Sequence, residues 1–467
     1  MQPLWTFPEL SAVLGVEPEG GVDRPVTGIS IDTRTLQAGD LFVALKDQRD
    51  GHDFVSIAFK ADAAAALVSE GYQRQPGDGT LFRVPDTLKA LEALGRAARD
   101  RIGPDASVVA VTGSAGKTGT KEMLRACLAQ LGATHASEKS YNNHWGVPLT
   151  LAQMPRETRF AVFEIGMNHA GEIRPLTKMV RPHAAIVTTV EAVHLEHFPS
   201  VEAIADAKGE IFEGLVPDGT AIIKYDNAHV GRLKSIAERF GAKPVTFGFG
   251  AGADVRGDDL KLDHDGSELI VRFGERSTPL RIAMPGRHIA ENALAVATAI
   301  DAIDADVEKA LPVLAGLQPP GGRGARSVLH LEGGDALLID ESYNANPASM
   351  RAALATLASV PRQKFPRRIA VLGDMLELGA DAPELHAGLK DAVEDAGIDL
   401  IFACGPHMKG LYDALPKSKR GGYAQTSSSL QPLLLSELHG GDAIMVKASN
   451  GTRLGALVEA LKSKFGN

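Results

Sequence analysis

The sequence has few cysteines, no long apolar run and no excess of positive charge. Its two cysteines, Cys127 and Cys404, exclude a disulfide framework and cannot by themselves form a four-ligand zinc site. No uncharged stretch reaches the roughly 18 residues of a membrane helix, and no basic flank near the N-terminus marks a signal peptide. The formal net charge of −9 gives no reason to expect nucleic acid or an anionic membrane as a partner. We therefore expect a soluble, cytoplasmic protein.

The 467 residues are 44% hydrophobic and 23% charged, which is typical of globular proteins. At roughly 100–200 residues per domain, this length predicts three domains. Short apolar runs alternate with stretches that carry apolar residues every three or four positions, such as 121–132 and 289–303. This alternation predicts the α/β class, with parallel sheets covered by helices on both faces. The predicted strands are 107–111, 160–163, 184–190, 336–339, 369–372, 400–403 and 443–446.

Changes in the sequence pattern along the chain predict the domain boundaries. We expect an N-terminal domain at 1–83, a helical linker at 84–104, a central domain at 105–320 and a C-terminal domain at 321–467. The Pro- and Gly-rich segment 317–324 provides the last boundary. Within the central domain, 246–284 alternates polar and apolar residues and predicts an antiparallel excursion. The glycines in this region predict a turn rather than a dinucleotide-binding fingerprint; they are Gly248, Gly250 and Gly252.

The most specific local motif is VVAVTGSAGKTGTKEML at 108–124. A β-branched strand runs into a glycine-rich turn and then into a helix, so backbone N–H groups and the helix N-terminus can bind an anion. Val111 replaces the first glycine of the long phosphate-loop pattern, but the short form T-G-x-x-G-K-T fits fully. We expect this loop to bind the nucleotide phosphates, through Gly113, Ser114, Ala115, Gly116, Lys117, Thr118 and Gly119.

Three further residues are candidates for metal binding. Glu164 follows a predicted strand at the sheet edge where ligands bind, and His194 has a similar position after the next strand. Lys208 falls within the apolar stripe of a helix that Ser200 would cap, where an ammonium needs a partner or must be neutral. Solvent exposure of Glu164 and His194, and snorkelling of Lys208 to the surface, are the alternatives.

The last segment places polar residues after two predicted strands. Asp340 ends the first of these, at a position suited to a ribose hydroxyl, and Asn344 and Asn346 follow in a loop. A carboxylate also follows the next predicted strand, in the motif LGDMLE at 372–377. Arg323 in the linker has the placement of a finger arginine that stabilises charge on a transferring phosphate, although exposed linker arginines are common.

Together these residues resemble the ATP-dependent Mur ligases of peptidoglycan synthesis, and within that family the branch that adds D-alanyl-D-alanine to UDP-N-acetylmuramoyl-tripeptide. The similarity covers nearly the whole chain. The matching stretches are SIDTRTLQAGDLFVAL (30–45), DGHDFV (50–55), TGSAGKT (112–118), YNNHWGVPLTL (141–151), FEIGMN (163–168), AVHLEHF (192–198), AKGEIF (207–212), GRHIAENA (286–293), LIDESYNANPASM (338–350), AVLGDMLELG (370–379) and VKASNGTR (446–453).

The resemblance implies an N-terminal domain for the UDP-sugar, a central ATPase and a C-terminal Rossmann-like domain. It implies ATP and Mg²⁺ as cofactors, with Mg²⁺ held by Thr118, Glu164, His194 and a Lys208 that CO₂ has carbamylated. It further implies a role near adenine for Asn292, near the γ-phosphate for Arg323 and near the ATP ribose for Asp340. The residues that it implies for the UDP-sugar peptide, the domain cleft and the dipeptide are Asp32, Thr33, Arg34, Asn142, Tyr343, Asn344, Asn346, Lys447 and Arg453.

The implied reaction activates the tripeptide carboxylate as an acyl phosphate, which the dipeptide amine then attacks. We expect the enzyme to be a monomer. The sequence departs from the family pattern at Gly119, Ile289 and Ala448, and none of these changes removes a group that the chemistry requires. Another amide ligase of the superfamily remains an alternative, either a diaminopimelate- or lysine-adding enzyme or a folylpolyglutamate synthase. A phosphate-loop NTPase that is not a ligase is the alternative from a different class.

Overall fold

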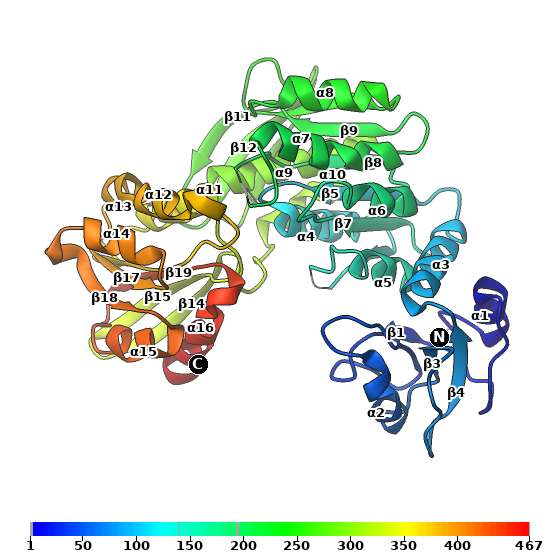
Figure 1. The fold of residues 1–467 in the computed structure, drawn as a ribbon. Helices are drawn as coiled ribbons and strands as arrows, with labels where there is room; N and C mark the ends of the chain where they lie inside the picture. The colour runs from blue at the N-terminus through cyan, green and yellow to red at the C-terminus, as the bar shows by residue number, and fades with distance from the viewer. Residues whose placement is uncertain (1–2, 139, 193–195, 467) are drawn as a thin grey trace.

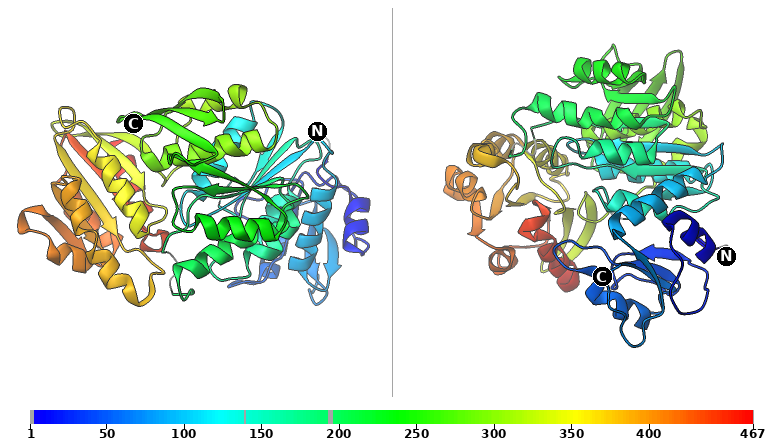
Figure 2. Two further views of the ribbon diagram at one scale, coloured as in Figure 1. Left: turned by 90° about the horizontal axis from the view of Figure 1, so that it is seen from above. Right: turned by 45° about the vertical axis from the view of Figure 1, so that its right-hand side comes forward.

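The computed structural model describes residues 3–138, 140–192 and 196–466 and contains three β-sheets in three successive stretches of the chain (Figure 1). The sheets have four, nine and six strands in chain order. Seen from above, the central part of the molecule lies between the two outer parts (Figure 2). Strands alternate with helices over much of the chain, and most neighbouring strands are parallel. The predicted α/β class is therefore confirmed.

The N-terminal part is a small parallel sheet with helices packed on it. Its elements are α1 (Phe7–Leu14), β1 (Gly28–Ser30), β2 (Asp40–Val43), η1 (Gly51–Phe54), α2 (Val55–Lys60), β3 (Ala65–Ser69), β4 (Thr80–Val84) and α3 (Thr87–Asp100). The strand order is β1-β2-β3-β4, and every neighbouring pair is parallel. Asp86 caps α3 by accepting from two backbone N–H groups, which starts the helix that leads toward the central part. The carboxyl ends of all four strands consequently lie at one edge, where Asp32 follows β1.

The central part is a nine-stranded sheet of order β13-β12-β11-β10-β9-β8-β5-β7-β6. Two separate hydrophobic clusters cover its two faces, one with α5 to α8 and the other with α4 and α9. Its elements are β5 (Ser107–Thr112), α4 (Lys117–Leu128), β6 (Thr134–Ala136), α5 (Gly146–Ala152), β7 (Phe160–Glu164), α6 (Ile173–Val180), β8 (Ala184–Val187), α7 (Val201–Gly209), η2 (Glu210–Gly214), β9 (Thr220–Lys224), α8 (Val230–Arg239), β10 (Lys243–Gly248), β11 (Val255–Leu262), β12 (Ser267–Phe273), β13 (Arg276–Ile282), α9 (Arg287–Ala302), α10 (Val307–Ala310) and η3 (Leu311–Ala315).

Two predictions for the central sheet need correction. The antiparallel excursion begins at β11 rather than at Thr246, because α8 returns the chain so that β10 pairs in parallel with β9. The strand predicted over 184–190 ends at Val187. The Thr188 amide still donates to the Thr112 carbonyl of β5 at 2.9 Å, but both Thr188 and Thr189 also bond to the phosphate loop. Thr188 Oγ1 donates to the carbonyl of Ala115 at 2.5 Å, and the Ser114 amide donates to the carbonyl of Thr189 at 2.9 Å.

The C-terminal part is a six-stranded sheet of order β14-β15-β19-β16-β17-β18, parallel except for the β14–β15 pair. Helices cover both faces, and each face has its own hydrophobic cluster. Its elements are β14 (Ala325–Leu331), β15 (Gly334–Glu341), α11 (Pro347–Ala358), β16 (Arg367–Gly373), η4 (Gly379–Asp381), α12 (Ala382–Ala387), α13 (Lys390–Asp395), β17 (Leu400–Cys404), α14 (Met408–Ala414), η5 (Lys417–Lys419), β18 (Arg420–Ala424), α15 (Ser427–Leu435), β19 (Asp442–Lys447), η6 (Asn450–Thr452) and α16 (Leu454–Phe465).

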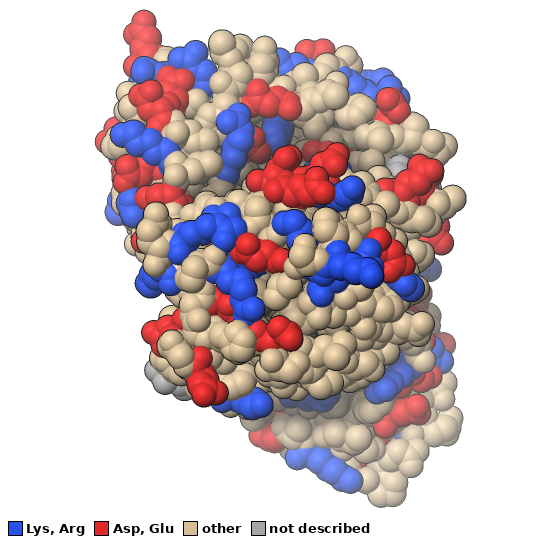
Figure 3. Space-filling view, turned by 90° about the vertical axis from the view of Figure 1, so that its left-hand side faces the viewer, with Lys and Arg blue, Asp and Glu red and all other residues tan. Residues whose placement is uncertain are grey.

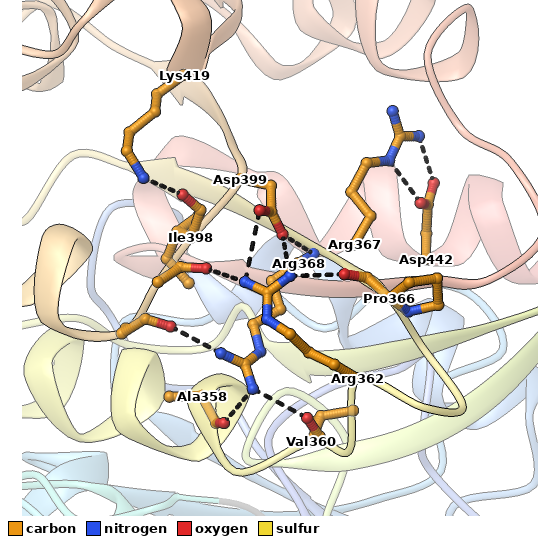
Figure 4. A network of polar contacts seen from close by, with 12 residues as sticks. Ala358, Val360, Arg362, Pro366, Arg367, Arg368, Ile398, Asp399, Lys419 and Asp442 are labelled. Atoms are coloured by element: carbon orange, nitrogen blue, oxygen red, sulfur yellow. Dashed lines mark hydrogen bonds and ion pairs between the residues drawn. The ribbon is translucent and has the colours of Figure 1, made fainter.

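An arginine network fixes the amino ends of the strands in this last sheet (Figure 4). Arg367 at the start of β16 makes two bonds of 2.7 and 2.8 Å to Asp442 at the start of β19. Arg362 and the backbone amide of Arg368 both donate to Asp399, which precedes β17. These charge-assisted bonds hold the three strand starts together, so the carboxyl ends at the opposite edge are left to form a site.

The outer surface of the C-terminal part carries both signs of charge. In Figure 3, Lys and Arg side chains are interspersed with Asp and Glu side chains over this face. Several of them form local pairs, such as Lys409 with Asp413 at 2.6 Å. In the described ranges, no helix is both long and apolar enough to cross a membrane.

Candidate functional site

The phosphate loop lies between β5 and α4 and requires glycine at two points. A Cβ at Gly113, whose φ is +150°, would lie 1.9 Å from Thr188 Oγ1. A Cβ at Gly116, whose φ is +84°, would lie 2.6 Å from Asn292 Oδ1. Both glycines thus combine an unusual backbone conformation with a close approach by a neighbouring residue. The geometry brings Asn292 of α9 directly against the loop.

Lys117 begins α4 and folds back over the loop. Its Nζ donates to the carbonyl of Gly113 at 2.6 Å. Burial lowers the pKa of Lys117, Glu164 opposes that shift and the nearby Arg323 adds to it. A cation that is desolvated in this way gains stability when an anion arrives, which is the requirement for binding a phosphate.

Thr118 and Glu164 meet at the carboxyl ends of two adjacent strands. Thr118 Oγ1 donates to Glu164 Oε2 at 2.8 Å and lies 3.1 Å from Ser140 Oγ. Asn142 Nδ2 donates to the other carboxylate oxygen, Oε1, at 2.7 Å. The site therefore gathers a hydroxyl and a buried carboxylate next to the phosphate loop. These oxygen donors fit the preference of Mg²⁺ for hard ligands.

Lys208 is buried at the end of α7, with a fractional exposure of 2%. Ser200 caps this helix, as predicted, by accepting from the Ala203 amide. Burial lowers the pKa of Lys208 well below its usual range, and the positive charge of Lys117 lowers it further. Within the ranges that the structure describes, no hydrogen bond or ion pair joins Lys208 to another residue. His194, the other predicted ligand on this side, lies outside the described residues.

The loop and the C-terminal part enclose a cavity of about 550 Å³. The phosphate loop, α4 and α9 form one side, and the residues that follow β15 form the other. The sequence-predicted residues that line the cavity are Ser114, Ala115, Gly116, Lys117, Thr118, Gly119, Asn142, Glu164, Asn292, Arg323, Tyr343, Asn344, Asn346 and Lys447. Segments that are far apart in the sequence are thus brought to one cleft.

Arg323 bridges the two sides of this cleft. Its guanidinium lies 4.2 Å from the centroid of the Tyr343 ring and donates to Ser140 Oγ at 3.3 Å. Ser140 also contacts Thr118, so one hydroxyl connects the linker arginine with the phosphate loop. Stacking on Tyr343 orients the planar cation toward the phosphate site.

Asp340 is 4% exposed and does not line the cavity. Its Oδ2 accepts from the Gly322 amide at 2.9 Å, and its Oδ1 accepts from Ser342 Oγ at 2.6 Å. Lys462 lies 3.7 Å from the same carboxylate. In this structure Asp340 therefore holds the linker turn that carries Arg323.

Two of the other C-terminal candidates, Asn346 and Lys447, already have structural partners. Asn346 caps α11 by accepting from the Ser349 amide at 2.8 Å. Lys447 is buried, and its Nζ donates to the carbonyl of Asn344 at 2.9 Å and pairs with Glu341 at 3.2 Å. Arg453 is exposed at the end of η6 and does not line the main cavity.

The predicted substrate residues of the N-terminal part lie away from this cavity. Arg34 makes four hydrogen bonds to Asp32, one from its backbone and three from its side chain, including Nε to Oδ1 at 2.9 Å, and its side chain is 85% exposed. Neither they nor Thr33 lines the cleft, whereas Asn142 lines it and contacts Glu164. The structure thus divides this set of residues between two places.

Three features of the site were missed in the sequence. Ser140 joins the linker to the loop, and Lys121, which is fully buried, donates to the Ser137 carbonyl at 2.5 Å. His288 lines the cavity, and burial lowers its pKa. The apolar positions of α4 predict that Lys121 faces inward, since Leu124 and Leu128 lie at i+3 and i+7. No local signal identifies Ser140.

Two family models match this chain. The first describes a Mur ligase middle domain and matches residues 111–300, and the second describes a Mur ligase glutamate ligase domain and matches residues 327–450. The two matched ranges contain the central site residues and the loops after β15, β16 and β19.

Characterised relatives match the chain over nearly its full length. The UDP-N-acetylmuramoyl-tripeptide–D-alanyl-D-alanine ligase of Escherichia coli is 35% identical, with 98% of each chain covered. The enzyme of the same description from Synechocystis is 36% identical, covering 94% of this chain and 92% of the relative. Crystal structure I of MurF from Acinetobacter baumannii superposes with a TM-score of 0.84 at 28% identity, covering 98% of this chain and 99% of that one.

Proposed function

The chain belongs to the Mur ligase family, and from that premise we propose that it is the ATP-dependent ligase that joins D-alanyl-D-alanine to UDP-N-acetylmuramoyl-tripeptide. The observation that carries this proposal is the full-length similarity to ligases of that description, together with a phosphate loop that faces the carboxylate Glu164. The products are the pentapeptide nucleotide, ADP and phosphate. The reaction belongs to peptidoglycan precursor synthesis.

The proposed reaction has two chemical steps. An oxygen of the terminal tripeptide carboxylate attacks the γ-phosphorus of ATP, which gives an acyl phosphate and ADP. The amine of the dipeptide then attacks the acyl carbon, and phosphate leaves. The first step brings two anions together, so cationic groups on both sides of the cleft have to neutralise them.

We assign the nucleotide to the 550 Å³ cavity. The backbone of 113–119 and the Lys117 ammonium would bind its β- and γ-phosphates, and Arg323 would stabilise charge on the γ-phosphoryl group during transfer. Asn292 lies against Gly116 of the loop, and we keep it as the residue near adenine, as the family resemblance implies. We keep Asp340 as the residue for the ATP ribose, which requires the sugar to compete with the Gly322 amide for its carboxylate.

Mg²⁺ would be held by Thr118, Glu164, His194 and a modified Lys208. When bound, the metal neutralises phosphate charge. Lys208 supports this assignment because burial lowers its pKa and so favours the neutral amine, which is the form that reacts with CO₂, losing a proton and becoming an anionic carbamate. Carbamylation would thus replace a buried amine, which has no bond to a described residue, by an anion that suits a cation-binding site.

We place the UDP-sugar on the N-terminal part, at Asp32, Thr33 and Arg34, with its peptide extending past Asn142 toward Tyr343. Lys447 and Arg453 are assigned to the side where the dipeptide enters. We further propose that the enzyme acts in the cytoplasm as a monomer. A UDP-peptide carries large polar groups that keep it from crossing a membrane. The enzyme therefore meets this substrate in the compartment where nucleotides are made.

The test is phosphate release from ATP with each candidate UDP-peptide crossed against several amino acceptors. Strong dependence on both the UDP-tripeptide and D-alanyl-D-alanine supports the proposal. Turnover of ATP that no acceptor changes would instead show an NTPase that is not a ligase. Lys117→Ala should abolish turnover with the fold intact, while Lys409→Ala, which removes an exposed lysine, should not.

A further inference from the structure

An ion pair at one end of the nucleotide cavity is separate from the residues assigned so far. Lys224, the last residue of β9, donates through Nζ to Oε2 of Glu291 on α9 at 2.7 Å. Both residues line the cavity, and their side chains are 16% and 15% exposed. A partly buried ion pair adds little to stability, because the cost of desolvation offsets most of the attraction. Stability therefore does not account for a pair in this lining.

The order of the central sheet places the pair away from the phosphates. Four adjacent strands lead into the cavity lining, in the order β9-β8-β5-β7 (Figure 1). The phosphate loop follows β5 and Glu164 ends β7, so the phosphates and the metal belong to that side. Lys224 ends β9, two strands or about 10 Å from β5 on the other side. Since Glu291 directly precedes Asn292, the residue kept near adenine, the pair lies at the end of the cavity that receives the base.

The pair presents a hydrogen-bond donor and an acceptor side by side. An ammonium has three N–H groups, and among the described residues Glu291 is the one hydrogen-bond partner of Lys224 Nζ. The other Glu291 oxygen, Oε1, pairs with Nε of Arg287 at 3.4 Å, and the Arg287 guanidinium lies 4.4 Å from the centroid of the Phe249 ring. These contacts orient the carboxylate and leave it room to accept from a ligand. Because the charges of Lys224 and Glu291 cancel, the pair suits a neutral polar edge better than a further phosphate.

Adenine has an edge that is complementary to this pair. Its C6 amino group donates and its ring nitrogen N1 accepts, whereas hypoxanthine and guanine carry an acceptor oxygen at C6 and a donor N1–H. A carboxylate only accepts and an ammonium only donates, so neither can reverse its role. Ile289, where the sequence departs from the family pattern, lines the same cavity but offers the base no polar group.

We propose that Glu291 and Lys224 select adenine as the base of the nucleotide, with the Glu291 carboxylate accepting from the C6 amino group and the Lys224 ammonium donating to N1. The proposal rests on the function proposed above, which supplies ATP, and it adds the residues that determine the choice of base. Inosine triphosphate would direct its O6 at the carboxylate and its N1–H at the ammonium. Both contacts would then be repulsive, so this nucleotide should be bound poorly.

Equilibrium binding of Mg²⁺-nucleotides to the full-length protein, measured by isothermal titration calorimetry, tests the role of Glu291 without either ligase substrate. We expect the parent to bind ATP roughly 10-fold more tightly than inosine triphosphate, as expected for side-chain contacts that read a base edge. Glu291→Gln should reduce this ratio to about twofold or less, because the amide can turn and donate to O6. Glu238→Gln, an exposed carboxylate on α8 outside the cavity lining, is the matched control and should keep the parent's ratio.

A second analogue tests the role of Lys224. In 1-deaza-ATP a C–H group replaces N1, so the parent should bind it roughly 10-fold more weakly than ATP. Lys224→Met keeps much of the side-chain volume but lacks the donor, so it should bind ATP and 1-deaza-ATP within about twofold of each other. Lys409→Met, which changes an exposed lysine of the C-terminal part, should retain the parent's preference.

The remaining outcomes overturn the proposal. Equal weakening of ATP and inosine triphosphate in Glu291→Gln would give the pair a purely structural role. A change confined to the preference for ATP over 2′-deoxy-ATP would assign the pair to the ribose. A parent that binds ATP and inosine triphosphate equally does not read the base at this edge. If the parent binds no nucleoside triphosphate, the proposed function itself is wrong, which separates that failure from the failure of the base contacts.

Discussion

Individual residues accommodate charge in different ways, as three lysines of the central part show. Lys121 and Lys208 are buried, and Lys117 is half-buried. Lys117 donates to the loop carbonyl of Gly113, and Lys121 donates to Ser137 and pairs with Glu122. Lys208 has no such bond to a described residue. Since an unpaired buried cation costs several kcal/mol, Lys208 is the one for which a chemical modification is expected.

Loss of Lys208 should be reversible by small anions. We expect Lys208→Ala to lower kcat by roughly 100-fold, the upper range for groups that orient metal ligands, and added acetate or propionate to restore part of it. The carboxylate would occupy the space and supply the charge of the missing carbamate. Lys117→Ala should show no rescue in the same steady-state assay. Absence of rescue in a folded, magnesium-supplied Lys208→Ala enzyme would contradict carbamylation.

Lys121 positions the loop that carries Ser140 and Asn142. Lys121→Met removes the ammonium but keeps the volume, so it leaves the Ser137 carbonyl without its donor. We expect the free energy of unfolding to fall by about 1–3 kcal/mol, measured by urea denaturation. Arg125→Met, which removes the exposed partner of Glu122, should change it by about 0.5 kcal/mol or less. Equal effects of the two changes would refute the special role of Lys121.

At the scale of elements, the loop between β16 and α12 depends on one histidine. His386 is fully buried; its Nδ1 donates to the Ala382 carbonyl at 2.6 Å, and its Nε2 accepts from Met375. Protonation of Nε2 would place two N–H groups face to face. Burial lowers the pKa of His386, outweighing the opposing effects of Ala382 and Asp374. The turn that carries Glu377 therefore needs the neutral imidazole.

This arrangement predicts a pH dependence of stability. Since the folded pKa of His386 lies below the unfolded value of 6.5, the unfolded state binds more protons between the two. The contribution of His386 is complete above pH 6.5 and is lost as the pH falls toward the folded pKa. His386→Gln should flatten the slope of unfolding free energy against pH just below 6.5, by at most about 1.4 kcal/mol per pH unit.

The sequence predicted which segments form strands and helices better than it predicted the residues at which they end. β5, β7 and α9 lie within two residues of their predicted positions, because buried strands and amphipathic helices have distinct apolar periods. The strand predicted over 184–190 was too long: the Thr188 amide makes the last bond to β5, and its side chain already bonds to the phosphate loop. The order of β8, β5 and β7 has no local signal, because it depends on which strands pack together.

At the scale of the whole molecule, Arg323 in the linker and Arg326 at the start of β14 connect the central and C-terminal parts. Arg323 reaches Ser140 on the nucleotide side, and Arg326 donates to the carbonyl of His264 at the β11–β12 turn. Burial lowers the pKa of Arg326, against the effects of Asp265 and Asp263. These contacts on either side of β14's start hold the C-terminal part against the central part. In the proposed reaction, this arrangement would exclude water from the acyl phosphate.

Loss of Arg323 should separate binding from chemistry. We expect Arg323→Ala to reduce the rate of the first turnover by about 10³-fold, while ATP binding changes only a few-fold, because the guanidinium acts on charge that develops during phosphoryl transfer. Rapid-quench measurement of ADP formation and equilibrium ATP binding test this together. Arg351→Ala, an exposed arginine on α11, should behave like the parent. A large loss of ATP affinity would contradict the assignment.

The sequence by itself determined the α/β class, the phosphate loop and the buried position of Lys208, because each follows from the order of neighbouring residues. Only the tertiary structure decided that Thr118 meets Glu164, 46 residues away, since that contact requires β5 and β7 to be neighbours. Likewise Arg323 reaches Ser140 across 183 residues only when the two parts dock. Local patterns fix where a strand ends, but the packing of whole sheets fixes which strand ends share a site.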